Sequence, residues 1–439
     1  MKVYLSTLVF VVLFLQGCGS PETDIPLAAE AAPVTSSSVV APPEVEPADD
    51  GSHWFETIED PKSDSIIYKS PADDRQYRYQ VLENGLKVLM ISDPEADKAA
   101  ASLSIDVGSF ENSKEREGLA HFLEHMLFLG TDKFPEPGEY QAFLSEHGGT
   151  FNAYTSLEET NYFFDIDPRY LAQTLDRFSR FFVKPLFNEE YVDRERHAVD
   201  SEYQLKIKDD SRREWDVLRE LANPEHPFSM FSVGSLQTLE NSDAAPVRKD
   251  LIAFYEKYYT ASRMDLVVLG NESLDELNTL VTERFSAIPS HKVELTSRFT
   301  PLFASELPFK VSIEPVKEIR SISFNFPMPS LEKDWQIKPA GFIGHLLGHE
   351  GEGSLLSVLK DLGLAEGLSS GLVFDSRHGA LFSVSVALTP DGIEQQERVT
   401  SYFFQWLKMV RESGLEAWRY DEVAKMSQVG FQFQGKRSP

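Results

Sequence analysis

The pattern of hydrophobic and polar positions divides the chain into alternating segments, typical of strands, and segments of helical period. Strand-like alternation is followed by helical periodicity several times, and the whole pattern then begins again near residue 307. Strands in one layer covered by helices in another are typical of an α+β fold. The pattern predicts strands at 77–81, 86–91, 101–107, 150–155, 160–166, 266–270, 311–314 and 321–326, and helices at 139–146, 170–182, 247–259 and 273–285.

With 439 residues the chain is long enough for two domains, each with its own core. We predict two related αβ sandwich domains with antiparallel sheets covered by helices, at 71–290 and 300–439. The second domain is shorter than the first and reads as incomplete. Its last predicted elements are a helix and the separate short segment 429–433.

The first 70 residues lack such a pattern. An apolar run from Leu8 to Leu15 follows Lys2 and is too short to span a bilayer, so we predict a signal peptide over 1–18. The stretch before Cys18, the only cysteine, resembles a bacterial lipobox and predicts a lipid anchor on that residue. The alternative is an ordinary secretory signal with an incidental cysteine. Residues 19–70 are proline-rich, and we predict a disordered acidic tether there. Together these features predict the bacterial cell envelope, with an outer-membrane lipoprotein facing the periplasm.

The charge balance narrows the range of partners. Acidic residues number 70 against 42 basic ones, giving a net charge of −28. This excess argues against nucleic acid or an anionic membrane as the main partner. It favours cationic peptides or is simply a solvated surface. A single cysteine excludes an intramolecular disulfide.

The stretch His121-Phe122-Leu123-Glu124-His125 carries the strongest chemical signal. In a helix, His121 and His125 lie at i and i+4, so both imidazoles lie on one face, with Glu124 near its edge. Two imidazoles and a carboxylate suit a hydrolytic zinc site, and the order H-x-x-E-H is the inverzincin signature. The alternative is a buried amphipathic helix with two satisfied histidines.

A second helix offers a third ligand. Asn188 is a good N-cap and is followed by two acids, which suit a first helical turn. Glu195 and Glu202 lie seven residues apart, so they share one face of this helix. A carboxylate there can complete a His2Glu zinc site that keeps a fourth position for water. Glu195 is either a carboxylate that orients a ligand or a surface acid on a charged helix.

The spacing and the flanking sequences resemble the pitrilysin/insulinase-type zinc metallopeptidases. In this family 76 residues separate the second histidine from the ligand glutamate, and 76 residues separate His125 from Glu202. Further similar stretches are GGTFNAYTSLEETNYFFDI, LDRFSRFFVKPLF, ANPEHPFSMF and GHEGEGSLLSVLKDLG. The resemblance implies one Zn²⁺ per chain, bound by His121, His125 and Glu202. It implies Glu124 as the catalytic base and Glu195 as the second catalytic carboxylate. Mn²⁺ or Co²⁺ could take the place of zinc, since the ligand types alone do not fix the metal.

The resemblance also implies two places for substrate. Asn152 and Ala153 would line the active site, where a peptide adds to the sheet as an extra strand; a plain hairpin is the alternative. His345, Gly348 and His349 repeat the zinc-helix spacing, but Gly348 stands where the glutamate would be. A second zinc site is therefore disfavoured, and the resemblance implies a distal site that binds the substrate's N-terminus.

The sequence thus predicts a zinc-dependent endopeptidase that hydrolyses peptides or small unfolded polypeptides. Large members of the family have four such domains in two halves, so the chain corresponds to the N-terminal half. A C-terminal half or a second subunit would complete the chamber. Two alternatives remain: a non-catalytic, partner-dependent half that binds peptides, and a lipid-anchored scaffold without metal. The substrate, the cleavage preference and the oligomeric state are left open.

Overall fold

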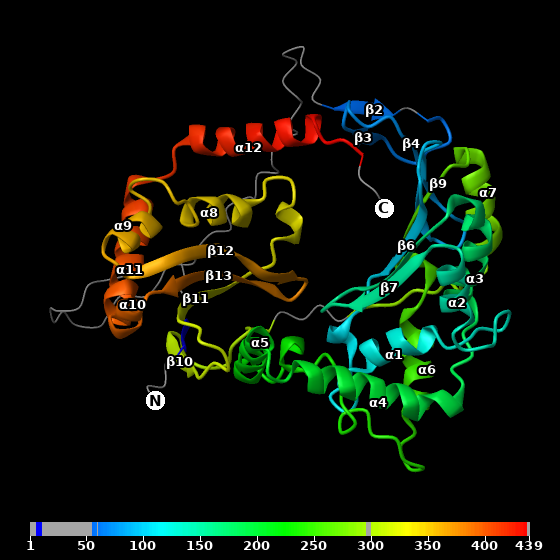
Figure 1. Ribbon diagram of the computed structural model, residues 1–439, viewed down its shortest axis with the longest axis horizontal. Helices are drawn as coiled ribbons and strands as arrows, with labels where there is room; N and C mark the ends of the chain where they lie inside the picture. Colours follow the sequence, from blue (N-terminus) through cyan, green and yellow to red (C-terminus); the bar gives the residue numbers. More distant parts are fainter. Residues whose placement is uncertain (1–5, 11–54, 59, 296–299, 437–439) are drawn as a thin grey trace, which may run out of the picture.

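A computed structural model describes residues 6–10, 55–58, 60–295 and 300–436. They form two bodies, each a sheet covered by helices, which lie side by side in Figure 1. The predicted α+β class is therefore confirmed. The domain boundaries stay a prediction.

The first sheet has six strands in the order β4-β5-β9-β6-β8-β7. β5 and β9 run parallel, and every other neighbouring pair is antiparallel. Among the described strands β7 lies at the edge of this sheet, so no described strand pairs with the other side of its backbone. The strands are β4 (Gln76–Val81), β5 (Lys87–Ser92), β6 (Ala99–Ile105), β7 (Thr150–Thr155), β8 (Thr160–Ile166) and β9 (Met264–Gly270).

The helices of the first domain cover this sheet and bury one large core (Figure 1). The helix predicted at 170–182 packs its apolar face on β6 and on the helix at 274–285, so its apolar positions are each 2% exposed or less. These positions are Leu171, Leu175, Phe178, Phe181 and Phe182. The helices are α1 (Leu119–Leu127), α2 (Glu139–Glu146), α3 (Leu171–Val183), α4 (Glu189–Lys206), α5 (Asp210–Leu221), α6 (Val247–Tyr258) and α7 (Leu274–Phe285).

Helix α1 begins at a close contact between two backbone segments. Its N-cap, Gly118, has φ +88°, and a Cβ there would lie 2.2 Å from the Cα of Gly234. Only glycine avoids both the left-handed strain and this clash. The contact fixes where α1 starts and packs the 233–234 loop against it.

We expect Gly118→Ala to lower the free energy of unfolding by roughly 2–5 kcal/mol, from left-handed strain and overpacking together. Gly138→Ala is a matched control, since Gly138 caps α2 with φ +83° but a Cβ added there would meet nothing within 4 Å. It should cost only about 1–2 kcal/mol. Denaturant unfolding of both variants measures the difference. Equal losses would show that the contact with Gly234 contributes nothing.

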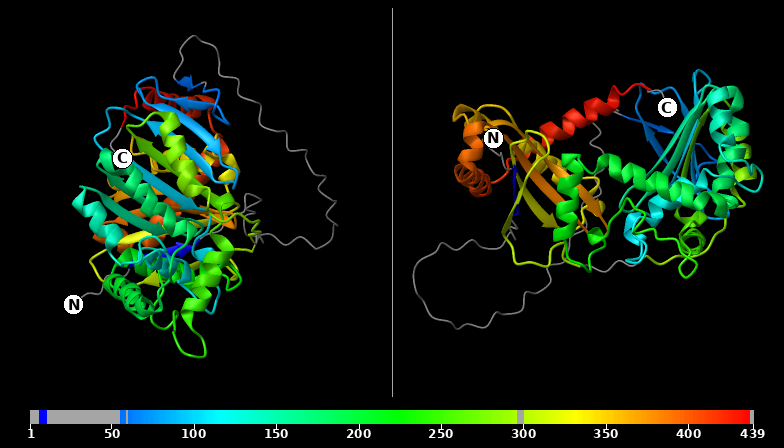
Figure 2. Two further views of the ribbon diagram at one scale, coloured as in Figure 1. Left: turned by 90° about the vertical axis from the view of Figure 1, so that its right-hand side faces the viewer. Right: turned by 60° about the horizontal axis from the view of Figure 1, so that its bottom comes forward.

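The second sheet has five strands in the order β10-β1-β11-β13-β12. β1 lies between β10 and β11, as β9 lies between β5 and β6 in the first sheet, but it runs in the opposite direction. The strands are β1 (Ser6–Phe10), β10 (Phe309–Ile313), β11 (Ser321–Met328), β12 (Ala365–Ser376) and β13 (Gly379–Leu388). Helices α8 (Pro339–Leu347), α9 (Leu355–Asp361), α10 (Pro390–Glu394) and α11 (Gln396–Ser413) accompany it (Figure 2).

Helix α12 (Ala417–Gln432) reaches from the second domain towards the first, across the top of Figure 1. The segment predicted separately at 429–433 continues this helix to Gln432. Its last carbonyl accepts a hydrogen bond from Ser70 Oγ at 3.0 Å. Just beyond it, the Lys436 ammonium lies 3.0 Å from an oxygen of Asp74. These contacts connect the end of α12 to the first domain.

The predicted tether at 19–70 differs in part from the structure. β2 (Glu56–Ile58) and β3 (Ile67–Lys69) pair as a short antiparallel ribbon, with Phe55 and Tyr68 in an edge-to-face ring contact. A few apolar and aromatic residues late in the segment are enough to make this local pairing. Residues 19–54 and 59 of the predicted tether lie outside the described residues.

Candidate active site

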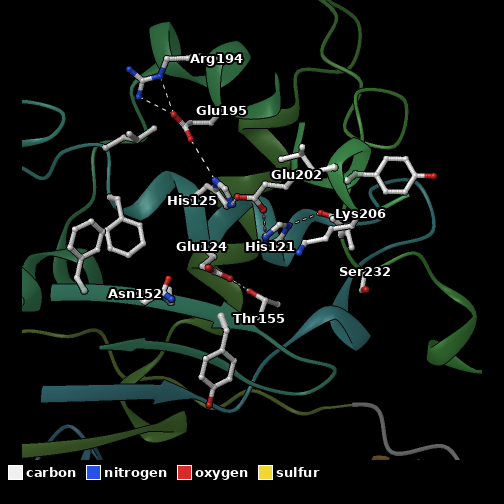
Figure 3. A pocket seen from close by; sticks show the side chains of 18 of the residues that line it. His121, Glu124, His125, Asn152, Thr155, Arg194, Glu195, Glu202, Lys206 and Ser232 are labelled. Atoms are coloured by element: carbon white, nitrogen blue, oxygen red, sulfur yellow. Dashed lines mark hydrogen bonds and ion pairs between the residues drawn. The ribbon is translucent and has the colours of Figure 1, made fainter. Parts of the chain in front are cut away.

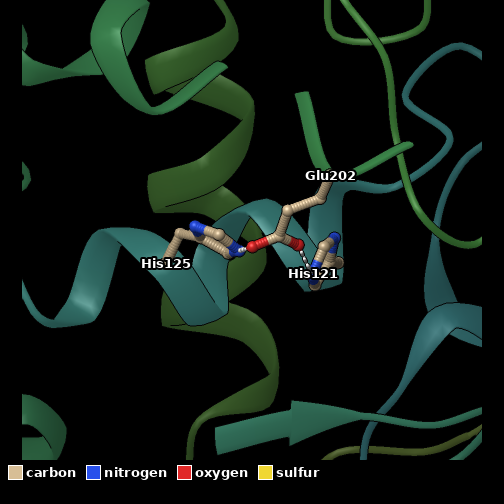
Figure 4. A group of neighbouring side chains, drawn as sticks. All are labelled: His121, His125 and Glu202. Atoms are coloured by element: carbon tan, nitrogen blue, oxygen red, sulfur yellow. Dashed lines mark ion pairs between the residues drawn. The ribbon is translucent and has the colours of Figure 1, made fainter. Parts of the chain in front are cut away.

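Helices α1 and α4 bring three predicted ligands together (Figure 4). His121 and His125 project from one face of α1, with ring centroids 4.8 Å apart. Glu202 extends from α4 between them, with its carboxylate oxygens 3.6 Å from His121 Nε2 and 3.7 Å from His125 Nε2. Among the described residues these side chains form the one group of His, Cys, Asp and Glu whose ligand atoms lie within 4.8 Å of one another.

The far nitrogen of each imidazole has a partner that orients the ring. His121 Nδ1 lies 2.7 Å from the carbonyl oxygen of Val233, to which it can donate. His125 Nδ1 lies 3.5 Å from a carboxylate oxygen of Glu195. Glu195 is itself held by Arg194, whose guanidinium is 2.9 Å away. Both rings thus turn Nε2 towards Glu202, as zinc-ligating histidines do when an outer partner fixes their orientation.

Glu124 lies beside the two histidines and faces β7 (Figure 3). It is 7% exposed and accepts a 2.5 Å hydrogen bond from the hydroxyl of Thr155. Burial raises the pKa of its carboxyl group, because the charged form loses hydration. A raised pKa brings a carboxylate closer to the value that suits a general base near neutral pH.

The charges of the cluster act on one another. Burial and the neighbouring His125 lower the pKa of His121. Burial also acts to lower the pKa of His125, but Glu195 and Glu202 outweigh it and raise that pKa to about 9. Hydrogen bonding to His125 lowers the pKa of Glu202. In the metal-free chain at pH 7 a proton on His125 therefore balances two carboxylates.

The arrangement fits a zinc ion. With bonds of about 2.0–2.1 Å, neighbouring ligand atoms in a tetrahedral site lie roughly 3.3 Å apart. The two distances from Glu202 are within 0.4 Å of that value, and two imidazoles with one carboxylate are a common donor set for catalytic zinc. His121, His125 and Glu202 would hold the ion, and Glu195 would orient one ligand.

A hollow of about 920 Å³ opens over the cluster (Figure 3). Asn152 and Ala153, predicted to contact substrate, line it from the edge strand β7. The free side of β7 thus faces the same space as the histidines. The amide N–H of Ala153 donates to Asn152 Oδ1 at 2.9 Å, a bond that a peptide carbonyl could replace.

The other predicted substrate residues lie apart from this cluster. His345, Gly348 and His349 line a hollow of about 670 Å³ between the end of α8 and β12 of the second domain. Gly348 is the C-cap of α8, and His349 Nδ1 accepts from the N–H of Gly351. They belong to no metal-binding group among the described residues. A role in binding substrate stays a prediction.

Three contacts at the site were not predicted from the sequence. Thr155 could have been found, since it lies two residues beyond Ala153 on the same strand and so on the same face. Arg194 adjoins Glu195, and a charged helix gave no reason to select it. The carbonyl of Val233 belongs to a loop, and no side-chain pattern marks it.

The chain resembles curated peptidases along most of its length. It is 42% identical to human insulin-degrading enzyme over 377 residues, 85% of this chain and 37% of that protein. It is 40% identical to the A-factor-processing enzyme of Saccharomyces cerevisiae over 375 residues, 84% of this chain and 36% of that protein. The chain therefore spans less than two-fifths of these relatives' length.

The predicted signal peptide and lipoprotein character are wrong. The two relatives named above are eukaryotic proteins, and a third, from Arabidopsis thaliana, is named a peroxisomal insulin-degrading enzyme-like protein. Part of the predicted leader, Ser6–Phe10, pairs in the second sheet as β1, because an apolar run serves as well for a central strand as for a leader. Neither the lipid anchor nor a second subunit finds support, and Cys18 lies outside the described residues. In the described part of the chain no helix has the length and apolar character to cross a bilayer. The location was inferred from this segment alone and stays a prediction.

Two family models match successive parts of the chain. Residues 87–225 match the insulinase model of peptidase family M16, and residues 246–426 match the model of the inactive M16 domain. The crystal structure of pitrilysin superposes with a TM-score of 0.80 at 29% identity, covering 88% of this chain and 41% of that one. Sequence, fold and the geometry of the cluster agree, and the chain belongs to the pitrilysin/insulinase family of metallopeptidases, M16.

Proposed function

We propose that the chain is a zinc-dependent endopeptidase whose active site lies between α1, α4 and β7. The observation that carries this proposal is the convergence of His121, His125 and Glu202 beside the buried carboxylate of Glu124. Catalytic zinc sites use three protein ligands and leave a fourth position open. The hollow above the cluster supplies the space for that position and for a peptide.

Each side chain has a role that follows from its place. A zinc ion held by the three ligands would act as a Lewis acid and lower the pKa of water towards about 7. Glu124 takes a proton from the attacking water and passes it to the leaving amine. Thr155 holds that carboxylate through its hydroxyl. Glu195 fixes the ring of His125.

The edge strand β7 gives a way to hold the substrate. An extended peptide can add to its free side through main-chain hydrogen bonds, which place the peptide backbone next to Glu124. Such binding is tolerant of sequence, since backbone groups are common to all peptides. Substrates would therefore be peptides or unfolded segments that can adopt an extended conformation.

The test measures zinc content and cleavage of a quenched-fluorescence peptide library by the purified chain. We expect one zinc per chain and hydrolysis that a chelator abolishes and added zinc restores. One zinc without hydrolysis would favour the alternative, a peptide-binding half that depends on a partner. Neither zinc nor hydrolysis would contradict the proposal.

We expect zinc binding to release about one proton per chain at pH 7. His125 has a raised pKa of about 9 in the metal-free chain, so it is protonated at pH 7 and must lose that proton to bind a metal. Apparent zinc affinity should therefore rise about tenfold per pH unit between pH 7 and 9, then level off. Calorimetry in buffers of different ionisation enthalpy counts the proton. No release at pH 7 would show that His125 is already neutral.

A further inference from the structure

Arg377 of the second domain contacts three carboxylates of the first. It lies in the turn between β12 and β13, and its Nε donates to Glu158 at 2.8 Å, while its backbone N–H donates to the other oxygen of that carboxylate at 3.0 Å. Its terminal nitrogens lie 3.2 Å from Asp106 and 3.4 Å from Glu111. One guanidinium thus joins three separate points of the first domain.

The contact with Glu158 lies close in sequence to Thr155, which binds the candidate base Glu124. Glu158 belongs to the turn that connects β7 to β8, and Thr155 is the last residue of β7 just before that turn. Thr155 donates to Glu124, so only two residues of backbone separate Glu158, which binds Arg377, from Thr155, whose hydroxyl holds the base. The turn pairs with its surroundings as well, since the N–H groups of Ser109 and Phe110 donate to its carbonyl oxygens.

The contact with Glu111 lies close to the start of α1. Glu111 ends the short 3₁₀ helix Ser109–Glu111, and the next residue is Asn112. Asn112 Oδ1 accepts from the N–H of Ala120 at 2.9 Å, one of the free donors in the first turn of α1. Ala120 immediately precedes His121, so this route ends at the first histidine of the cluster.

We propose that Arg377 is a positioning residue for the active site, holding both the β7–β8 turn and the first turn of α1 in place. Only the expected effect on kcat rests on the proposed function; the positioning of the two segments does not. It gives the second domain, which carries no zinc group of its own among the described residues, a task in the chemistry of the first.

The surroundings of Arg377 favour a rigid connection. Phe374, three residues before it, stacks on Phe228 of the first domain with ring centroids 4.9 Å apart. The side chains of Glu158 and Glu111 are 14% and 9% exposed, so both carboxylates need a nearby cation. Burial raises the pKa of Glu111 to about 7 even with the arginine present. Removing the guanidinium would take from Glu158 its hydrogen-bonded cation and leave Glu111 with the N–H of Gly108 and the charge of Arg263, so the turn and the 3₁₀ helix would move to hydrate the two acids.

The test compares Arg377→Ala with Arg263→Ala. Arg263 donates to Asp106, the carboxylate it shares with Arg377, and its charge also acts on Glu111, but it donates to neither Glu158 nor Glu111, so it is a control for the hydrogen bonds of Arg377. In Arg377→Ala, we expect amide hydrogen exchange at 155–159 and 119–122 to rise at least roughly tenfold. We expect kcat to fall roughly 10- to 100-fold with KM within about threefold, because misplacing a catalytic group affects the chemical step. Arg263→Ala should change neither the hydrogen exchange of these two segments nor kcat.

Arg377→Lys gives a graded result, since lysine keeps the charge and loses the planar fork. Its kcat should lie between wild type and Arg377→Ala. If Arg377→Ala does not fold, Glu158→Gln removes the negative charge and one of the two oxygens that accept from Arg377, and it should raise exchange at 155–159 in the same way. Unchanged exchange in the folded variants, or equal effects of Arg263→Ala, would overturn the proposal. If the wild-type chain hydrolyses no peptide, the proposed function fails, and hydrogen exchange alone decides whether Arg377 positions the site.

Discussion

Replacing Glu124 with glutamine should lower kcat for peptide hydrolysis by roughly 10²- to 10⁴-fold while zinc remains bound. The amide keeps the shape of the side chain, and its oxygen can still accept from Thr155. It cannot take a proton, so only the base is lost. Single-turnover cleavage and zinc content of the same preparation provide the measurement.

The stability of this variant provides an independent check. Because burial raises the pKa of Glu124, its ionised form reduces the stability of the folded chain at pH values above the ordinary carboxyl range. The neutral amide removes that cost, so the melting temperature of Glu124→Gln should equal or exceed that of wild type. Glu190→Gln, an exposed change in the first turn of α4, should leave kcat unaltered. Zinc-loaded Glu124→Gln with wild-type kcat would exclude Glu124 as the base.

Replacing His125 with alanine should abolish zinc binding at micromolar metal and reduce hydrolysis to background. His125 would supply one of three ligands and also pairs with both Glu195 and Glu202, so its loss leaves Glu195 paired with Arg194 alone and Glu202 beside His121 alone. Two remaining ligands do not make a closed site for zinc. Equilibrium dialysis with a zinc indicator measures the affinity, and near-wild-type binding would exclude His125 as a ligand.

The zinc affinity of Glu195→Gln is the value with which that of His125→Ala is compared. Its carboxylate contacts the far nitrogen of His125 rather than the ligand position, so we expect only a roughly 10- to 100-fold loss of zinc affinity. Excess zinc should restore its hydrolysis but not that of His125→Ala. Equal losses in the two variants would place both side chains in direct contact with the metal.

The local parts of this site could be predicted from the sequence. The i, i+4 spacing of His121 and His125 fixes their common face whatever surrounds the helix, and the seven-residue spacing of Glu195 and Glu202 does the same for α4. The 76-residue separation then pointed to these two helices as partners. Helix geometry and the family spacing were therefore sufficient to predict that these ligands come together.

The remaining parts depend on tertiary contacts that leave no local pattern. Val233 orients His121 through a main-chain carbonyl, which every residue type possesses. Arg377 lies 219 residues from Glu158 along the chain, and a lone arginine in a turn usually faces solvent. The predicted leader was misjudged for a related reason: an apolar run has the same composition in a leader, a helix or a strand, and Ser6–Phe10 pairs as β1.

The domains contact each other on two sides, and this has a mechanical consequence. On one side lie the β12–β13 turn with Arg377 and the start of α5, where Asp210 accepts from the N–H groups of Val316 and Lys317. On the other side lies the end of α12 (Figure 1), and just beyond it Lys436 pairs with Asp74, Asp93 and Glu95. Bodies joined at a single point can swing about it, whereas bodies joined on two sides move only by stretching or releasing one joint. The lysine joint is the weaker, because two of its three acids are largely exposed and salt screens them. Raising the ionic strength would then weaken the contacts of Lys436 first. The end of α12 would separate from the first domain, and the domains would turn about the contacts around Arg377.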